Sequence, residues 1–329
     1  MSTVFSGIIK RKRTRKGIKA VDRKPNLPEL PEEIIYNIVA LLPVVVAART
    51  SMLSRNWRYR WTETPNLILD RQFSERLSLK YGSTFQDEYI AIVDSLLFQH
   101  PRPCIQKFVL EIPQLPTTHF SIITDDWLLT LATNGLRELN LDNSANVAGR
   151  YLTIHTCFFS EFPELTRATL TNCCFRTPLK TQGSCNLTHL TLNQVTFLPP
   201  SWPSDGRFIH APQLAVLDLR DCKGLHCLRL RAPSLRKLIL FRNWQLDLSY
   251  FIRCKNLTDV RITTRLAGIQ RLRHGKYGSI NLTKLIRSWP KLTQLHLDAT
   301  TRKHLGADSD GIRPRRFPIR IQRLKQSSS

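Results

Sequence analysis

The chain of 329 residues has no apolar run approaching the ~18 residues that a membrane-spanning helix needs, so no transmembrane segment is predicted. Its N-terminus also lacks the apolar core of a signal peptide, which argues against secretion. The Asn-x-Thr triplets at Asn186, Asn256 and Asn281 are therefore not expected to carry glycans. We expect a protein of the nucleus, the cytoplasm or both that does not bind membranes.

Signatures of metal sites and of catalysis are missing as well. The eight cysteines form no Cys-x-x-Cys pair and have no His-spaced zinc pattern, and in a protein that is not secreted they are expected to be reduced thiols. No Gly-rich phosphate loop or nucleophile elbow occurs, and the histidines and carboxylates are scattered. The sequence thus predicts a non-catalytic protein with no metal and no cofactor.

Negative charge is scarce, since 49 Lys or Arg oppose 25 Asp or Glu and give a net charge of +24. Nine Lys or Arg and one Asp lie in residues 1–24, and eight and two lie in residues 302–329. We interpret residues 1–26 as a basic disordered arm and residues 302–329 as a basic disordered tail. The run from Lys10 to Lys16 is typical of a nuclear-import signal, a nucleic-acid contact or a solubilising tail. Nucleic acid is an unlikely partner on this evidence, because no binding motif or aromatic residue accompanies the run.

A Leu-x-x-Leu-x-Leu pattern recurs along most of the remaining chain. Its copies begin at Ile105, Leu136, Leu165, Leu187, Leu214, Leu235, Leu257 and Leu292. The pattern is typical of an irregular leucine-rich repeat, in which each copy gives one short parallel strand. A single copy cannot bury its leucines, so stacked copies form one core along a curved solenoid. We expect this solenoid over residues 71–301, with mixed helical and irregular connections.

Three copies carry Cys or Asn three residues after their last Leu, at Cys173, Cys222 and Asn243. In this repeat the position turns inward and hydrogen-bonds the exposed backbone of the bend. A structural role is therefore favoured over a redox role for Cys173 and Cys222.

Three stretches outside the strands have helical patterns. One begins at Thr124 as the capping residue and ends at Gly135, and another begins at Ser279 and is stopped by Pro290. The third has an apolar stripe and is expected to cap the N-terminal end of the solenoid, with an exposed docking helix as the alternative. Its stripe consists of Phe85, Tyr89, Ile92, Val93, Leu96 and Leu97.

Residues 30–61 are helical in pattern and contain more apolar residues than so short a segment buries by itself. Pro31 suits the first helical position, and the two glutamates after it suit the helix dipole. Pro43 ends this helix. A second helix is expected over residues 44–51, and a third from Ser54 as the N-cap to Trp61. The apolar stripe of the first helix consists of Ile34, Ile38, Leu41 and Leu42, widened by Ile35 and Val39.

The order Leu30-Pro-Glu-Glu-Ile34, Leu41-Leu-Pro43, Arg49-Thr-Ser51 and Leu53-Ser-Arg-Asn-Trp57, with Trp61, resembles the F-box, here assigned to residues 27–70. With the repeats behind it, the chain resembles the plant-type F-box/leucine-rich-repeat proteins. The phrases Ala211-Pro-Gln-Leu214 and Ala232-Pro-Ser-Leu235 also recur in that family. The implied fold class is α/β: a short N-terminal three-helix F-box followed by the solenoid.

The resemblance implies a substrate-recognition adaptor of an SCF-type E3 ubiquitin ligase complex, itself without catalytic residues. The F-box would dock on the small linker protein and through it on a cullin-RING scaffold. Trp57 and Trp61 are expected to hold the helices together or to brace them on the repeats. The alternative is that the segment only caps the solenoid. The residues that the motif assigns to linker contact are Leu30, Pro31, Ile34, Ile38, Leu42 and Pro43.

The chain departs from the family in two places. Val44, Val45 and Val46 stand where relatives usually have polar or charged residues. Three exposed valines would make the linker interface more apolar than usual or impair it. The chain also stops at a basic tail where many relatives have a further domain, so it is expected to be a shortened member.

An unknown protein substrate is expected on the concave face, where the third, fifth and seventh residues of each copy point outward. These positions mix charges and contain few aromatics, which suits a protein or peptide better than nucleic acid and leaves a small-molecule co-ligand open. Two other functions remain: a protein-binding scaffold with a degenerate F-box, and a nuclear scaffold driven by the basic tails. The candidate positions are Glu138, Asn140, Arg167, Thr169, His189, Thr191, Asp218, Lys237, Ile239, Asp259, Arg261, Gln294 and His296.

Overall fold

The structure, a computed structural model, describes residues 30–100, 105–114, 120–144, 152–155, 161–176, 186–197, 207–225, 228–243, 248–263, 286–298 and 320–321. The predicted basic arm and most of the predicted basic tail lie outside these residues. None of the helices in the described ranges has the length and apolar character needed to span a membrane.

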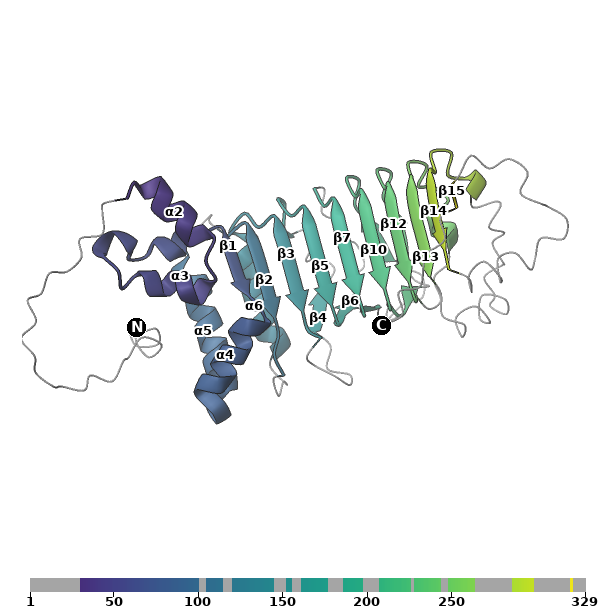
Figure 1. Ribbon diagram of the computed structural model, residues 1–329. Coiled ribbons are helices and arrows are strands. Elements are labelled where there is room, and N and C mark those ends of the chain that lie inside the picture. The colour runs from purple at the N-terminus through teal and green to yellow at the C-terminus, as the bar shows by residue number, and fades with distance from the viewer. Residues whose placement is uncertain are drawn as a thin grey trace, which may run out of the picture.

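A ten-stranded parallel sheet runs along the molecule and forms its framework (Figure 1). Eight consecutive strands of this sheet are the eight repeat copies, so the predicted solenoid is confirmed. The strands in spatial order are β1 (Asn66–Leu69), β2 (Lys107–Glu111), β3 (Glu138–Asp142), β5 (Arg167–Thr171), β7 (His189–Asn193), β10 (Val216–Arg220), β12 (Lys237–Phe241), β13 (Asp259–Thr263), β14 (Gln294–Leu297) and β15 (Arg320–Ile321).

The first and last strands lie outside the repeat copies. β1 lies within the range assigned to the F-box and pairs with β2, with Asn66 opposite Lys107. Leu67 and Leu69 of β1 are fully buried, so the solenoid core begins here. β15 lies in the range predicted as a disordered tail and pairs with β14.

Alternation along the strands places the core on one side of the sheet. In β3, Leu139 and Leu141 are buried, whereas Glu138, Asn140 and Asp142 are half-buried on the other side. The same alternation holds in β2, β7, β12 and β13. The predicted inward and outward positions are therefore confirmed for these strands, and their inward side chains join one continuous apolar core.

Short strands in the connections form two further parallel sheets. One consists of β4 (Leu152–His155), β6 (Cys173–Arg176) and β8 (Thr196–Phe197), and the other of β9 (Arg207–His210) and β11 (Leu228–Arg231). Phe175 and Phe197 stack with ring centroids 5.5 Å apart and fill the space between layers. These connections were predicted to be irregular, and the paired strands in them are a correction to that prediction.

The bends after β5, β7, β10 and β12 share one backbone conformation. Asn172, Gln194, Asp221 and Arg242 directly follow strands and have φ between 48° and 55°. Each donates its N–H to the last carbonyl of the next strand, at 2.7 to 2.9 Å. The repeated left-handed turn therefore carries the hydrogen-bond pattern of the sheet beyond the strand ends.

Cys173, Cys222 and Asn243 occupy the ladder position at this bend, as predicted. Asn243 Nδ2 donates to the Leu219 carbonyl at 2.8 Å, and its Oδ1 accepts the Cys222 N–H at 3.1 Å. Cys222 Sγ lies 3.3 Å from the Leu192 carbonyl, and Cys173 Sγ lies 3.3 Å from that of Thr171. Burial raises the pKa of the Cys222 thiol to about 12, so it remains protonated.

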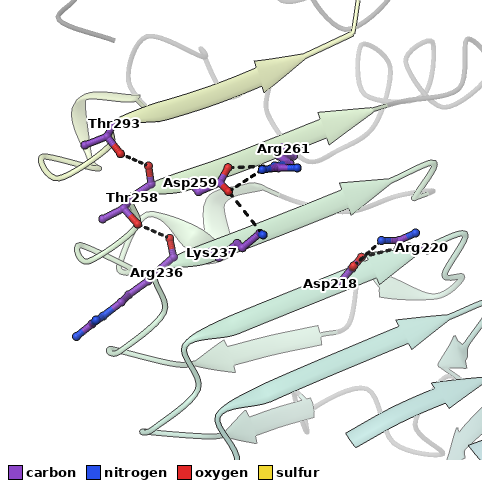
Figure 2. Close-up of polar contacts among 8 residues, drawn as sticks. All are labelled: Asp218, Arg220, Arg236, Lys237, Thr258, Asp259, Arg261 and Thr293. Carbon is purple, nitrogen blue, oxygen red and sulfur yellow. Dashed lines mark hydrogen bonds and ion pairs between the residues drawn. The ribbon is translucent and has the colours of Figure 1, made fainter. Parts of the chain in front are cut away.

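A second ladder of hydrogen bonds, which was not predicted, crosses the sheet at the N-terminal ends of the strands. At the second position of four copies a threonine hydroxyl donates to the carbonyl of the equivalent residue in the preceding copy. Figure 2 shows two of these bonds, from Thr258 to Arg236 at 3.1 Å and from Thr293 to Thr258 at 2.9 Å. Thr166 and Thr188 make the other two.

Helices cover the β1 end of the solenoid (Figure 1). α5 (Phe85–Gln99) buries the predicted stripe, including Tyr89 and Leu96, which confirms a capping helix and excludes an exposed docking helix. α4 (Arg71–Tyr81) was not predicted; it begins where the Asp70 carboxylate accepts the Phe73 N–H at 3.0 Å.

α6 (Phe120–Ala132) begins earlier than predicted. Thr124 is therefore not its N-cap but an internal, buried residue. The helix predicted to begin at Ser279 lies mostly outside the described residues. Within its predicted range, Ile286 and Arg287 are described and are helical.

Candidate functional site

The N-terminal module contains two α-helices and two short 3-10 helices. These are α2 (Glu32–Ala40), α3 (Val44–Thr50), η1 (Arg55–Trp57) and η2 (Arg60–Glu63). The predicted continuous helix from Ser54 to Trp61 is thus wrong, because Tyr59 has φ 70° and interrupts it. Ser54 is extended and its side chain makes no capping bond.

Helix α2 divides its apolar residues between two faces. Ile35 and Val39 are 2% and 0% exposed and belong to the core, whereas Ile34, Ile38 and Leu41 are 44%, 37% and 86% exposed. The exposed three are spaced by four and three residues, so they lie on one side of the helix. This exposed stripe of Ile34, Ile38 and Leu41 is hereafter the α2 apolar face.

The six predicted linker-contact residues all lie at least partly at the surface. Pro31, Ile34, Ile38 and Pro43 are exposed, and Leu30 and Leu42 are half-buried against the core. Three more exposed apolar residues were missed: Met52 (64%), Leu53 (55%) and Tyr59 (65%). The sequence does indicate that Met52 and Leu53 are exposed, because they lie beyond the end of α3 and so cannot belong to its buried side.

The three valines at the start of α3 are not an exposed patch. Val44 is 7% exposed, and Val45 packs against the core as a half-buried residue. Val46 is also half-buried. The expectation of three exposed valines is therefore wrong, because the first residue of α3 joins the apolar core that also contains Ile35 and Val39.

Trp57 and Trp61 are buried and brace the module, as predicted. The Trp61 ring meets His100, at the end of α5, edge to face with centroids 5.7 Å apart. Arg60 forms ion pairs with Glu32 of α2 and, at 3.2 Å, with Glu63. These contacts hold the 3-10 turns against both α2 and the solenoid.

The second candidate surface is the outward, concave side of the sheet. Parallel pairing in register aligns its side chains in rows across the strands, so that Glu138, Arg167 and His189 lie side by side. Lys237 and Asp259 continue this row, and Asn140 and Arg261 lie in the next one. The structure therefore brings the predicted recognition residues together on one face.

Two predicted recognition residues are less accessible than expected. Asp218 is 7% exposed because the Arg220 guanidinium covers its carboxylate, and His296 is 8% exposed. Both still occupy outward positions, opposite Ile239 and Arg261 respectively. These two side chains therefore keep the predicted outward position but have little exposed surface.

Charged residues at the outward positions are largely paired. Lys107 Nζ lies 2.8 Å from Glu138 Oε1, and Arg220 and Arg261 each bind an aspartate of their own strand. Lys107 and Arg220 were missed as recognition candidates, although the alternation that selected Glu138 places them on the same face.

The pKa values of three groups at outward positions are shifted. Hydrogen bonding to Asp218 raises the pKa of Arg220. Burial raises the pKa of Glu111, assisted by Asp142, and burial lowers the pKa of His189, assisted by Arg167. In the described part of the chain no group of His, Cys, Asp or Glu has the arrangement to hold a metal ion. The arrangement therefore offers paired charges for binding.

Comparison with known proteins matches the module that carries the α2 apolar face and most of the repeat strands. The F-box domain model matches residues 27–69, and the model "FBD-associated F-box protein At5g56370, LRR repeats" matches residues 124–292. F-box/FBD/LRR-repeat protein At1g13570 from Arabidopsis thaliana is 30% identical over 217 residues, which cover 65% of this chain and 48% of that protein.

F-box/LRR-repeat protein At5g02910 from the same plant is 43% identical over 51 residues, or 16% of this chain and 11% of that protein. The match to At1g13570 thus spans about half the length of that relative, or 48%. A crystal structure of an internalin (inlF) from Listeria monocytogenes matches with a TM-score of 0.23 at 14% identity over 73% of this chain and 86% of the other, too low a score to support any argument. Since the repeat model covers half of the chain and the F-box model covers its helical module, this chain belongs to the plant-type F-box/leucine-rich-repeat proteins.

Proposed function

We propose that this protein is the substrate-recognition adaptor of an SCF-type E3 ubiquitin ligase complex. The observation that carries the proposal is the division of α2, which buries Ile35 and Val39 yet leaves Ile34, Ile38 and Leu41 exposed. The solenoid has its own continuous core, so this second face is not needed to complete the fold. A contiguous apolar stripe with no internal partner is typical of a protein-binding surface.

In this proposal the two surfaces have separate tasks. The α2 apolar face, with Pro31, Pro43 and the half-buried Leu30 and Leu42, docks on the linker subunit and through it on the cullin-RING scaffold. The concave face holds the protein to be modified. The chain contributes proximity rather than chemistry, because it raises the local concentration of a substrate lysine beside the activated ubiquitin.

Retention of the full chain by immobilised linker protein tests the proposal. Wild type should be retained, and Ile34→Asp with Leu41→Asp should abolish retention because two charges then enter the apolar interface. Leu79→Asp is the matched control: Leu79 on α4 is 89% exposed and lies outside the F-box module. Failure of the wild-type protein to bind, or equal loss with Leu79→Asp, would reject the docking role.

The alternative function, a protein-binding scaffold with a degenerate F-box, was based on the expected run of exposed valines. Val44 is buried, and its two neighbours are half-buried, so no observation now favours that alternative.

We propose further that the protein acts at least partly in the nucleus, since the run from Lys10 to Lys16 is typical of an import signal. Replacing its five Lys and Arg residues after Lys10 by Gln should shift a fluorescent fusion of the full chain to the cytoplasm. An unchanged distribution would contradict this assignment.

A further inference from the structure

Charge is distributed unevenly along the solenoid. Between residues 66 and 165 the sequence has 12 Asp or Glu and seven Lys or Arg, whereas between residues 166 and 300 it has six and 21. The half beside the F-box is therefore acidic, and the far half is strongly basic. Such a field favours the approach of a negatively charged partner to the far half.

Two strands of the basic half carry the same ion pair on the concave face (Figure 2). Arg220 binds Asp218 through Nε–Oδ1 and Nη2–Oδ2 contacts of 2.9 and 2.8 Å. Arg261 binds Asp259 through the same atoms at 3.3 and 3.1 Å. Lys237, on the strand between them, approaches Asp259 to 3.8 Å.

The arginine is the more accessible partner in both pairs. The side chains of Arg220 and Arg261 are 50% and 42% exposed, against 10% for Asp218 and 16% for Asp259. A partner that approaches this face therefore meets guanidinium groups, while the aspartates lie beneath them.

The pairing also fixes the arginines in position. Two hydrogen bonds to one carboxylate hold each guanidinium, which lowers the side-chain entropy lost when a partner binds. Nη1 of Arg220 and of Arg261 has no hydrogen-bond partner within the described residues. Each arginine thus keeps donors for a further carboxylate.

Half-buried apolar side chains lie between the two pairs. Ile239 of β12 stands in register between Asp218 and Arg261, and Phe241 stands between Arg220 and Thr263. Both remain partly exposed on the concave face. The surface over β10, β12 and β13 therefore combines cations with an apolar centre.

We infer that this surface, the β10–β13 patch, binds an extended acidic segment of the protein substrate. Carboxylates of the segment bind Arg220 and Arg261, and an apolar side chain between them packs on Ile239. Arg220 and Arg261 are two strand spacings apart, about 10 Å, and out of register by two residues, about 7 Å, so they are about 12 Å apart. An extended chain rises about 3.3 Å per residue and directs alternate side chains to the same face, so the two carboxylates lie four residues apart. This inference deepens the proposed function and depends on it.

A peptide fits this patch better than nucleic acid. The two aspartates offset two of the three cations of the patch, so its small net charge suits a short acidic segment better than a continuous phosphate backbone. Phe241 is the only Phe, Tyr or Trp at the outward positions of the described main strands, and Arg242 already lies over its ring at 4.7 Å. A stacking platform for bases needs more exposed aromatic surface.

Binding of peptide pools to the full-length protein tests the inference. Each pool consists of fluorescent dodecapeptides with Glu, Gln or Lys fixed at positions 5 and 9 and mixed residues elsewhere. The Glu pool should bind at least about tenfold more tightly than the Gln pool, because two charge-assisted contacts are lost with Gln. The Lys pool should bind more weakly still.

Two variants locate the binding. Arg220→Gln with Arg261→Gln should weaken binding of the Glu pool about tenfold to a hundredfold. The control, Arg236→Gln with Arg253→Gln, removes the same charge from two exposed residues of the same half and should change binding less than about twofold. Figure 2 shows the Arg236 side chain directed away from both ion pairs.

A third variant separates loss of binding from loss of folding and from net charge. Asp218→Asn with Arg220→Gln leaves the net charge unchanged and leaves no unpaired carboxylate, yet it should still weaken binding of the Glu pool. Its thermal unfolding should match that of wild type. Unchanged binding in this variant would overturn the inference.

Three other results would also overturn it: equal binding of the Glu and Gln pools, equal loss in the Arg236 and Arg253 control, or displacement of the Glu pool by a 20-nucleotide uridine RNA. Linker retention measured on the same samples keeps the two proposals apart. Retained linker with no peptide preference rejects the β10–β13 patch alone, and lost linker with intact peptide binding rejects the adaptor role alone.

Discussion

Asn243→Ala removes the side chain that satisfies two backbone groups in the bend between β10 and β12. Asn243 Nδ2 donates to the Leu219 carbonyl at 2.8 Å, and Oδ1 accepts the Cys222 N–H at 3.1 Å. Leu219 and Cys222 are fully buried, so water does not replace these bonds without opening the bend. Each unsatisfied backbone group costs about 1–3 kcal/mol, so the loss of both partners should lower the free energy of unfolding by about 2–6 kcal/mol.

Asn256→Ala provides the matched comparison. Asn256 Nδ2 also donates to a backbone carbonyl, that of Pro233 at 2.8 Å, but the bond is exposed and water takes the place of the side chain. Its loss should cost no more than about 0.5 kcal/mol. Urea unfolding followed by tryptophan fluorescence measures both variants against wild type.

Amide hydrogen exchange gives a second, local readout. The Cys222 N–H should exchange faster in Asn243→Ala and remain unchanged in Asn256→Ala, because only the first variant removes its acceptor. Equal unfolding free energies for the two variants, or unchanged exchange at Cys222 in Asn243→Ala, would refute the assignment of a ladder role to Asn243.

Three further predictions concern Trp61, His100 and the buried thiols of Cys173 and Cys222. Trp61→Ala should lower the free energy of unfolding by about 3–5 kcal/mol in urea titrations, since Trp61 is 4% exposed, and Trp61→Phe should recover part of the loss. Burial lowers the pKa of His100 below that of the unfolded chain, so its contribution is present above about pH 6.5 and is lost as the pH falls through the folded pKa. Unfolding free energies at several pH values should show this decline in wild type and not in His100→Asn. Cys173 and Cys222, whose thiol pKa values are raised by burial, should resist Ellman's reagent at pH 8 in the folded protein and react in guanidinium chloride, as read by mass mapping.

The sequence predicted the sheet well because the repeat determines its own register. Leu139 and Leu141 face inward in β3 for the same reason that Leu238 and Leu240 do in β12: period-two alternation leaves one side for the core. β1 was not predicted, because Asn66–Leu69 is too short to show the full repeat pattern. Its place in the sheet depends on pairing with β2, which sequence spacing does not reveal.

The candidate sites were predictable by position and not by accessibility. The repeat pattern placed Asp218 on the concave face. The Arg220 side chain covers Asp218 because of its rotamer, which the spacing of residues in the sequence does not determine. Likewise, the motif located Val44 correctly at the start of α3, yet its burial depends on how Pro43 orients that helix against α2. A left-handed residue at Tyr59, with φ 70°, divides a pattern that propensity alone reads as one helix.

The joint between the F-box and the solenoid has a mechanical consequence for the proposed function. The carbonyl of Pro65 accepts the N–H groups of Gln106 and Lys107 at 2.8 and 2.9 Å, so the end of the F-box is bonded into the first pair of strands. Trp61 packs on His100 across the same joint, and one apolar core includes both Ile35 and Leu297. No flexible linker therefore separates the α2 apolar face from the recognition strands.

Rigid attachment fixes the distance at which a bound segment is presented. β10 and β13 lie five and seven strand spacings from β1, or roughly 24 and 34 Å along the sheet. A flexible connection would let many lysines of a substrate reach the ubiquitin-transfer site, at a low effective concentration for each. A rigid connection instead favours those substrate lysines that lie at one particular distance from the bound acidic segment. In the proposed function, substrate choice then depends on the spacing between an acidic segment and an accessible lysine as well as on the segment itself.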